Sequence, residues 1–443
     1  MKKKILFLLL ILLLIFSFFA GSIFSRKNKP FFEIQAKYVF SIYHKIFKTK
    51  IIPLKLSQKN KEKKNIKYFN SFTIEMKKID SMSFKAESIQ DEKYKNMPGN
   101  KAIFQHRSAA FYVMKKNGEL IFKIFTRDGH LFSNKNIKRY KLPSTYDLHN
   151  GKGGLRGVFL FEGESYGLMA SEKLGCQYAS VINLDKSKTI FETDCLPDFS
   201  LIHYDALGGA NIHFEDKILL TIGTPTNSSN LIRNLAQNKK SYFGKIISFS
   251  AKDLNNKNID ESFKIKPEIF TIGHRNPQGF ARIGDYLYSS EHGPRGGDEI
   301  NLINRNNNYG WPISSYGTKY ESLYLKKSYK YNHEKYGFTE PLYQFTPSIG
   351  ISSLANCPSS LIKYFERKGC LLVNSLKGSS IYVFLLDKTL QRVIGFEKLK
   401  LGERLRNFAN NPDGTLFEDE DGSIYVITDK GNTYNLKFIL KKD

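Results

Sequence analysis

Two segments of the chain hold residue types that could bind a ligand or a metal ion. The first, Gly273–Gly279, reads GHRNPQG and supplies the guanidinium of Arg275 and the amide of Asn276. The second, Glu291–Asn301, reads EHGPRGGDEIN. A guanidinium is a permanently charged, planar fork that matches the geometry of carboxylates. The first segment therefore supplies a fixed cationic fork and an amide close in sequence to the glycine-rich turn of the second.

The second segment also has the composition of a calcium site. Gly293 and Pro294 begin a tight turn whose backbone carbonyls can face inward, and Asp298 and Glu299 follow as hard oxygen ligands. Ca²⁺ binds carbonyl and carboxylate oxygens. On spacing alone, a turn-capping Asp and a surface Glu are the simpler explanation of the acidic pair. Both interpretations stay open.

The elements that position these residues have the pattern of short β-strands. After about residue 70, apolar runs rich in β-branched and aromatic residues recur every 8–12 residues, with turn chemistry between them. Lys115–Gly118, for example, places Asn-Gly between two such runs, which is the strongest two-residue hairpin signal. About 370 residues of strands are too many for one sandwich, whereas a propeller adds blades without enlarging its core. The pattern predicts an all-β fold and favours a propeller.

Two other motifs are better explained as structural turns. Gly163–Gly167 matches the Gly-x-Ser-x-Gly signature of a nucleophilic serine, but a second strand follows it where that signature requires a helix. We therefore predict a plain hairpin there. Gly151–Gly157, GKGGLRG, lacks the spacing of a dinucleotide-binding loop and no βαβ unit surrounds it.

On its two long motifs the sequence resembles the glucose/sorbosone dehydrogenase family, the soluble aldose sugar dehydrogenases that use pyrroloquinoline quinone (PQQ). The resemblance covers roughly residues 150–440. It extends to further segments, namely Gly244–Ser248 (GKIIS), Asn308–Pro312 (NYGWP), Asn374–Gly378 (NSLKG), Arg404–Arg406 (RLR) and Asn411–Gly414 (NPDG). The resemblance implies a six-bladed β-propeller over residues 69–443, an exported location, and PQQ and Ca²⁺ bound over the central channel.

The resemblance also implies which residues hold the cofactors. The positions that match the family's quinone-binding residues are Arg275, Asn276, Lys377, Arg404 and Arg406. The carbonyls of Gly293 and Pro294 match its Ca²⁺ ligands, and that ion would polarise the quinone as a Lewis acid. The implied reaction is oxidation of a sugar or other alcohol. The same cations would also suit ion pairs with carboxylates at the edges of blades.

The segment Asp205–Ala210 departs from the family at the general base. The family has His two residues before a Gly-Gly or Ser-Gly pair and Arg directly after it, whereas here Ala206 and Ala210 occupy those positions. His203 and Asp205 are the nearest candidates for a base, which alcohol oxidation requires. A second hypothesis is therefore a non-catalytic propeller that serves as a binding module. A calcium-dependent hydrolase is a third, supported by analogy of fold alone.

The charge of the chain is concentrated at its N-terminus. The 443 residues carry a net charge of +26, which invites a nucleic-acid or membrane interpretation. Residues 1–70 hold sixteen Lys and Arg against two Glu, a net charge of +14. Within them, Ile5–Phe24 is free of charges and long enough to span a bilayer as a helix, with Ala20–Ser22 as a possible cleavage site. We predict a membrane anchor or signal peptide at residues 1–25, an exported protein that faces the periplasm, and no nucleic-acid partner.

Residues 26–68 are predicted to form a basic linker. Apolar residues at helical spacing over residues 33–49 suit either a helix on anionic lipid or a linker helix packed on the main domain, and a Lys-rich tether follows. The chain's four cysteines have no Cys-x-x-Cys spacing, so a zinc or thioredoxin-like site has no support. Cys176 and Cys195, and Cys357 and Cys370, could form two local disulfides in an oxidising compartment, or all four could be buried thiols.

Overall fold

The computed structural model of the chain describes residues 66–68, 72–82, 107–134, 136–143, 153–173, 175–196, 206–225, 230–255, 264–319, 329–366 and 369–440. The chain divides into two units, residues 1–64 and 65–443, and all of the described residues belong to the second. The predicted hydrophobic helix at residues 5–24 and the amphipathic stretch at residues 33–49 lie outside the described residues. The helices of the described ranges include none that is both long and apolar enough to cross a membrane.

The described residues form six antiparallel sheets, five of which are consecutive four-stranded meanders. The first two are β3 (Ser108–Lys116), β4 (Glu119–Thr126), β5 (His130–Ser133) and β6 (Ile137–Arg139), then β7 (Gly154–Phe161), β8 (Glu164–Lys173), β9 (Cys176–Asn183) and β10 (Lys188–Glu192). The third and fourth are β11 (Gly208–Phe214), β12 (Lys217–Ile222), β13 (Lys245–Ser250) and β14 (Glu268–Ile272), then β15 (Pro277–Ile283), β16 (Tyr286–Glu291), β17 (Asp298–Ile303) and β18 (Tyr343–Phe345). The fifth is β19 (Ile351–Asn356), β20 (Cys370–Ser375), β21 (Ser380–Leu386) and β22 (Val393–Lys400).

The sixth sheet joins the two ends of the propeller domain. Its strands, in spatial order, are β1 (Ile66–Tyr68), β2 (Phe72–Lys78), β25 (Thr433–Leu440), β24 (Ile424–Thr428) and β23 (Leu405–Phe408). β2 pairs with β25 along its whole length, from Phe72 opposite Leu440 to Lys78 opposite Tyr434. The ring of blades is thus closed by backbone hydrogen bonds. β1 begins three residues before the predicted domain boundary at residue 69.

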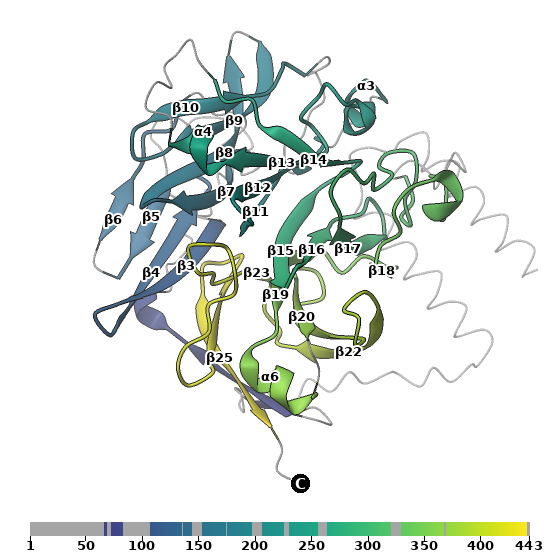
Figure 1. Cartoon of the computed structure of the whole chain (residues 1–443). Coiled ribbons are helices and arrows are strands. Elements are labelled where there is room, and N and C mark those ends of the chain that lie inside the picture. The colour runs from purple at the N-terminus through teal and green to yellow at the C-terminus, as the bar shows by residue number, and fades with distance from the viewer. Residues whose placement is uncertain are drawn as a thin grey trace, which may run out of the picture. The chain divides into compact units, whose positions relative to one another are not determined.

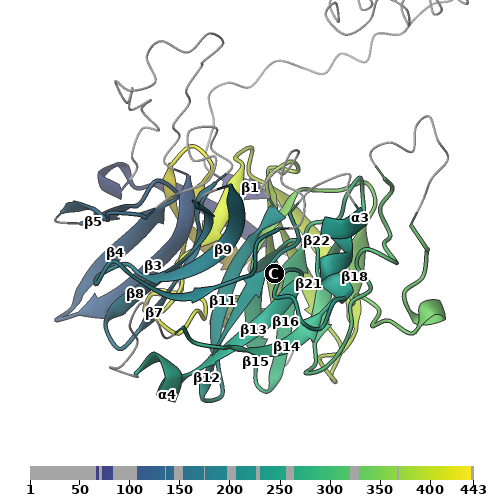
Figure 2. The same cartoon turned by 90° about the horizontal axis from the view of Figure 1, so that it is seen from above.

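The innermost strands β3, β7, β11, β15, β19 and β23 surround the middle of the ring in Figure 1, and Figure 2 shows the same ring after a quarter turn. Each of these strands contacts the innermost strands of its two neighbours. The sequence prediction of a six-bladed β-propeller is therefore confirmed. Short helices lie in the loops: η1 (Asp80–Met82), α3 (Asn230–Asn234), η5 (Leu235–Gln237), α4 (Ala251–Leu254), η6 (Glu334–Tyr336) and α6 (Ser359–Tyr364).

The apolar core is divided among the interfaces between blades. Six clusters of buried apolar residues are present in the described residues, and each lies between two neighbouring sheets. Phe159 of β7, for instance, contacts Phe249 of β13, with their ring centroids 6.2 Å apart. Because each blade buries both faces against its neighbours, the ring rather than any single blade is the stable unit.

Local turn chemistry forms the hairpins where the sequence predicts them. Asn117 and Gly118 both have positive φ, at 52° and 81°, and connect β3 to β4. Gly163 lies in the turn between β7 and β8, so the Gly-x-Ser-x-Gly match is a hairpin, as predicted.

Both pairs of cysteines form disulfides. Cys176 is bonded to Cys195 in the second blade, and Cys357 to Cys370 in the fifth. Closing loops of 19 and 13 residues in this way stabilises the folded chain by roughly 3 kcal/mol each.

Candidate functional site

The candidate residues lie in loops at one face of the propeller. In each four-stranded meander, the loop before the innermost strand and the loop between the second and third strands emerge at the same face, because the strands alternate in direction. Arg275 and Arg404 are in loops of the first kind, and Lys377 and the turn Gly293–Gly297 are in loops of the second kind. The fold therefore gathers these segments, from three different blades, around one mouth of the channel.

The Arg275–Asn276 turn is held by the buried carboxylate of Glu291. Its Oε1 accepts hydrogen bonds from the backbone N–H groups of Arg275 and Asn276, the second at 3.2 Å. Its Oε2 is 2.9 Å from Nδ1 of His274, whose Nε2 is 2.8 Å from the hydroxyl of Thr271. Glu291 is 4% exposed and His274 is fully buried. The turn between β14 and β15 is thus fixed by side chains beneath it.

The guanidinium of Arg275 is oriented by two contacts. Its Nη1 donates to the backbone carbonyl of His292 at 3.0 Å, and its Cζ lies 5.5 Å from the ring centroid of Trp311, a cation–π geometry. The side-chain oxygen of Asn276 accepts from the backbone N–H of Gly208 at 3.1 Å. Arg275 is buried yet lines a small cleft that also borders Gly293 and Pro294.

Ala206, which the sequence motif predicts to stand at the family's His position, lies beside the Arg275 turn. A Cβ atom on Gly223 would be 2.0 Å from the carbonyl oxygen of Ala206 and 2.7 Å from that of Arg275, so the two backbones meet at this glycine. Ala206 is 2% exposed. The side chain of Ala206 is thus a buried methyl group, which neither donates nor accepts a proton. The predicted bases His203 and Asp205 lie outside the described residues.

A buried lysine supports the same turn from the third blade. The ammonium of Lys245 is fully buried and donates to the carbonyls of Leu235, Ala236 and Phe243 at 2.7–2.9 Å. Burial lowers the pKa of Lys245 to about 7. The carbonyl of Ala236 also accepts from the N–H of Gly273, which begins the GHRNPQG segment. Lys245 is therefore a positioning residue for this segment.

Asp298 closes the glycine-rich turn. Its Oδ1 accepts from the N–H of Gly293 at 3.1 Å, and its Oδ2 accepts from the hydroxyl of Ser348 at 2.6 Å and the N–H of Ile351 at 3.1 Å. Burial tends to raise the pKa of Asp298, but nearby His292 and these donors outweigh it and lower the pKa to about 2. This is the turn-capping role that the spacing allowed. Both oxygens of Asp298 are engaged by these donors.

Glu299 is buried, which excludes the alternative of a surface residue. Its Oε1 is 3.4 Å from Nε2 of His333, and its Oε2 accepts from the amide of Asn301 at 3.3 Å. Burial raises the pKa of Glu299. Burial by itself lowers the pKa of His333, but the ion pair with Glu299 outweighs it and raises that pKa. No group of three or more His, Cys, Asp or Glu side chains that could hold a metal occurs within the described ranges.

Arg404 and Arg406 share one carboxylate, Asp429, at the end of β24. Nε of Arg404 donates to Oδ2 at 3.0 Å, and Nε of Arg406 donates to Oδ1 at 2.7 Å. Burial tends to raise the pKa of Asp429, but Arg406, Arg107 and Arg404 outweigh it and hold the pKa below its usual range. Arg404 and Arg406 therefore do form ion pairs with a carboxylate, which was the alternative to binding a ligand. The side chain of Arg404 nevertheless remains half exposed, and Lys377 is exposed.

Asp429→Asn is expected to destabilise the propeller by about 2 kcal/mol at neutral pH, because it removes the charge that offsets three arginines. The folded-state pKa of Asp429 lies below that of the unfolded chain, so its contribution is present above about pH 4 and is lost as the pH falls through the folded-state pKa. Urea unfolding of both proteins from pH 7 to pH 2 checks this. The difference in unfolding free energy between the wild type and Asp429→Asn should become smaller below pH 4. A difference that does not change with pH would contradict this prediction.

Two arginines that the sequence did not single out as binding residues lie in the channel. Arg127, after β4, and Arg156, in β7, line a cavity with Arg406, and all three side chains are largely buried. Glu291, Lys245 and Asp429 were also missed. Glu291 and Asp429 act on residues 15 or more positions away, and Lys245 binds backbone carbonyls, so no side-chain spacing marks these three residues.

Comparison with known proteins shows to which family the chain belongs. The profile of the family described as Glucose / Sorbosone dehydrogenase matches residues 178–436. The chain belongs to the glucose/sorbosone dehydrogenase family. The matched range contains the Arg275 turn, the Gly293–Gly297 turn and the Asp429 pairs, so the site just described is built from the part that defines the family.

Curated relatives share about half of their length with this glucose/sorbosone dehydrogenase family member. An uncharacterised protein of Synechocystis sp. is 31% identical over 229 residues, covering 49% of this chain and 52% of that protein. Aldose sugar dehydrogenase YliI of Escherichia coli is 29% identical over 234 residues, covering 52% and 59%.

Solved structures show the same fold. A glucose dehydrogenase crystal structure has a TM-score of 0.56 and 24% identity, covering 75% of this chain and 96% of that one. The apo-form of the soluble aldose sugar dehydrogenase of Escherichia coli has a TM-score of 0.54 and 24% identity, covering 76% and 96%. At this identity the likeness supports the propeller architecture of the family member described here.

Proposed function

We propose that this chain binds PQQ and Ca²⁺ at the mouth of the channel and oxidises a sugar or other alcohol. The observation that carries the proposal is the Arg275–Asn276 turn, which Glu291 holds rigidly against the carbonyl-rich turn Gly293–Gly297. An aldose sugar dehydrogenase among the relatives supports a sugar as the substrate class.

The residues at the mouth fit the two groups. A planar tricarboxylate needs several cations at fixed positions, and Arg275, Arg404 and Lys377 supply them from three blades. Arg275 is already oriented by His292 and Trp311, so little side-chain freedom remains to be lost on binding. A Ca²⁺ ion would take the carbonyl oxygens of Gly293 and Pro294, with Asp298 and Glu299 supporting the turn.

The chain's own residues would bind and orient the reactants. When bound, the quinone supplies the hydride acceptor and Ca²⁺ supplies Lewis acidity. Asn276 is fixed next to Gly208, where its amide can donate to a ligand oxygen. Removal of the hydroxyl proton requires a base. His203 and Asp205 remain our candidates for this role.

A second candidate function is a non-catalytic binding propeller. Ala206 favours it, because the sequence motif predicts His at this position in the family, whereas the Ala206 side chain is a buried methyl group. The described residues that line the channel cavity include no His, Asp or Glu either. Such a protein would retain the binding residues at the mouth without turnover.

We also propose that the protein acts in the cell envelope, with residues 5–24 as its anchor or signal. Two disulfides support an oxidising compartment. The electron acceptor would then be a component of that compartment.

Arg275→Ala is expected to weaken PQQ binding about 100-fold, because it removes an oriented, desolvated guanidinium from the carboxylate site. Titrating the purified full-length protein with PQQ and Ca²⁺ while recording absorbance measures this directly. The matched control is Arg305→Ala, which removes a surface arginine paired with Glu268. Wild-type protein without saturable binding at micromolar PQQ would refute the proposal.

Turnover separates the two candidate functions. Dye-linked oxidation of a panel of aldoses and alcohols, abolished by Arg275→Ala but not by Arg305→Ala, would identify an enzyme. Saturable PQQ binding with no turnover on the whole panel would favour the binding propeller.

A further inference from the structure

Trp311 forms the support on which the guanidinium of Arg275 lies. The Cζ atom of Arg275 is 5.5 Å from the centroid of the Trp311 ring, and both residues line the cleft that borders Gly293 and Pro294. The backbone N–H of Trp311 donates to the carbonyl of Gly273, two residues before Arg275, at 3.0 Å. The position of the indole therefore affects where the guanidinium points.

The indole is not held by its own polar atom. Trp311 is 7% exposed, and its Nε1–H is shielded from solvent and finds no acceptor among the described residues. The ring contacts Tyr329, with the two centroids 5.0 Å apart. The position of the indole thus depends on packing and on whatever holds the backbone of Trp311.

Gln237, in η5 of the third blade, holds that backbone with its side chain. Its Nε2 donates to the carbonyl of Trp311 at 2.6 Å and to Oδ1 of Asn308 at 3.1 Å. Its Oε1 accepts from Nδ2 of Asn308 at 2.7 Å, so the two side-chain amides pair reciprocally. A carbonyl only accepts, so the atom of Gln237 that faces the Trp311 carbonyl has to be the amide nitrogen. Both polar atoms of this side chain therefore bind one segment, Asn308–Trp311.

The same amide pair packs on the turn that carries Arg275. A Cβ atom on Gly273, where φ is 83°, would lie 2.2 Å from Oδ1 of Asn308. The backbone of the third-blade loop reaches the same glycine, because the carbonyl of Ala236 accepts from the N–H of Gly273 at 3.1 Å. Ala236 and Gln237 thus hold both the turn and the segment beside it.

The backbone before Gln237 is itself fixed. The ammonium of Lys245 donates to the carbonyls of Leu235 and Ala236, the two residues that precede it. The Gln237 side chain is partly exposed and belongs to none of the apolar clusters of the described residues. Its replacement therefore removes the contact with Trp311 without opening the core.

We propose that Gln237 is a positioning residue for the binding site at the mouth. It fixes the backbone of Trp311, and the indole, together with the carbonyl of His292, keeps the Arg275 guanidinium in the cleft. The ligand in this inference is the PQQ of the proposed function. The effect of Gln237 on Trp311 does not depend on that ligand.

Trp311 is the only tryptophan of the chain, so tryptophan fluorescence reports on this contact alone. Gln237→Met keeps the length of the side chain and removes its hydrogen bonds. In the full-length protein without PQQ, quenching of Trp311 by acrylamide should rise at least about twofold, because a released indole becomes accessible to solvent. The same variant should bind PQQ about tenfold more weakly in the absorbance titration, since a hydrogen bond that positions a binding group is lost.

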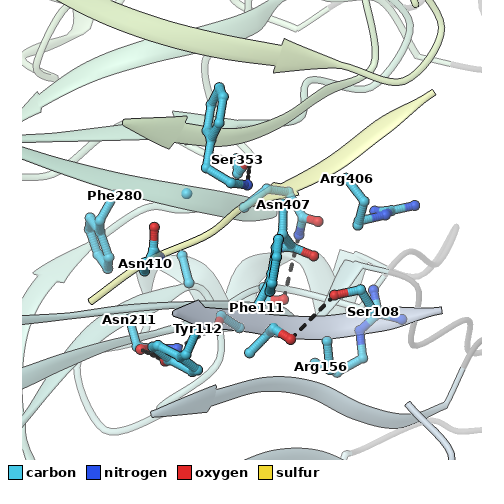
Figure 3. A pocket seen from close by; sticks show the side chains of 18 of the residues that line it. Ser108, Phe111, Tyr112, Arg156, Asn211, Phe280, Ser353, Arg406, Asn407 and Asn410 are labelled. Carbon is cyan, nitrogen blue, oxygen red and sulfur yellow. Dashed lines mark hydrogen bonds between the residues drawn. The ribbon is translucent and has the colours of Figure 1, made fainter. Parts of the chain in front are cut away.

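Asn211 provides a matched control for the loss of an amide that joins blades. In the channel cavity its Nδ2 donates to the carbonyl of Val158 at 3.0 Å, and its Oδ1 accepts from the hydroxyl of Tyr112 at 3.1 Å (Figure 3). Asn211→Leu removes these hydrogen bonds and leaves those of Trp311 intact. It should lower the free energy of unfolding, while Trp311 quenching stays at the wild-type value. An equal rise of quenching in this variant would show general loosening of the ring of blades and would overturn the proposal.

Gln237→Glu tests the hydrogen bond to the Trp311 carbonyl by itself, and it decides the matter if Gln237→Met does not fold. An ionised carboxylate only accepts, whereas a protonated carboxyl can donate to that carbonyl. Trp311 quenching should therefore exceed the wild-type value at neutral pH and return toward it at about pH 4.5, near the ordinary pKa of glutamate. The wild type, measured at both pH values, corrects for other titrating groups. Increased quenching that does not respond to pH would refute the assigned hydrogen bond.

The two readouts separate this proposal from the proposed function. Unchanged Trp311 quenching in folded Gln237→Met protein would overturn the proposal, whatever happens to stability or PQQ affinity. Increased quenching with unchanged PQQ affinity would also overturn it, because Arg275 would then not depend on the indole. A wild type that binds no PQQ would refute the proposed function, whereas increased quenching in the two Gln237 variants would still support the positioning of Trp311 by Gln237.

Discussion

Glu291→Ala is expected to lower the free energy of unfolding by about 3–5 kcal/mol and to abolish measurable PQQ binding. Alanine leaves the backbone N–H groups of Arg275 and Asn276 and Nδ1 of His274 without the acceptor that they share. All three residues are buried, and each unsatisfied buried donor costs about 1–3 kcal/mol. The turn that carries Arg275 would then lose its fixed conformation. Urea unfolding and a PQQ titration measure the two effects separately.

Glu291→Gln is the matched control for this prediction. Its remaining carbonyl oxygen can accept from the two backbone N–H groups, while its amide faces Nδ1 of His274, which accepts in the other imidazole tautomer. We expect this variant to retain most of the stability and most of the PQQ affinity. Equal losses of stability and PQQ affinity in Glu291→Gln and Glu291→Ala would show that both depend on the negative charge of Glu291 rather than on its positioning of the turn.

Gly157→Ala is expected to destabilise the ring by about 4 kcal/mol or more, or to prevent folding. A Cβ atom on Gly157, in β7, would lie 1.8 Å from the carbonyl oxygen of Gly209, in β11, and the atoms that it would meet are backbone atoms of Gly209. The clash can be relieved only by moving two neighbouring blades apart, which disrupts the apolar cluster between them. Circular dichroism during heating and the yield of soluble protein measure the outcome.

Gly395→Ala provides the control for a glycine in a strand. A Cβ atom there meets nothing within 4 Å, and the residue has no positive φ. This variant should be as stable as the wild type or slightly more stable, because alanine restricts the unfolded chain. A similar loss of stability in Gly157→Ala and Gly395→Ala would contradict the steric explanation.

The sequence predicts those parts of the fold that depend on the backbone preferences of neighbouring residues. Asn117-Gly118 specifies a two-residue turn through its own backbone preferences, and the strand that follows Gly163 excluded a serine nucleophile. The number of blades came from the family resemblance, because strand spacing does not count blades. The closing pair, β2 with β25, joins residues from opposite ends of the domain, and no local pattern marks such a pairing.

The candidate site was predictable only in part. The motifs predicted Arg275, Asn276 and the turn at Gly293 as candidates, but not the carboxylates that organise them. Glu291 was quoted as a motif letter, and its role follows only when β16 is placed beneath the turn before β15. Arg156 was noted as part of a glycine-rich segment, and no role was predicted for it. Its position in the channel depends on which side of β7 faces inward.

The pairing of β2 with β25 has a consequence for how the chain is made. The two strands are more than 350 residues apart, so the last blade can be completed only after nearly all of the domain has been synthesised. Until then β24 and β2 present open edges, which are templates for pairing with other chains. An emerging chain would therefore depend on protection of these edges, and cleavage within the final strand would reopen them in the mature protein.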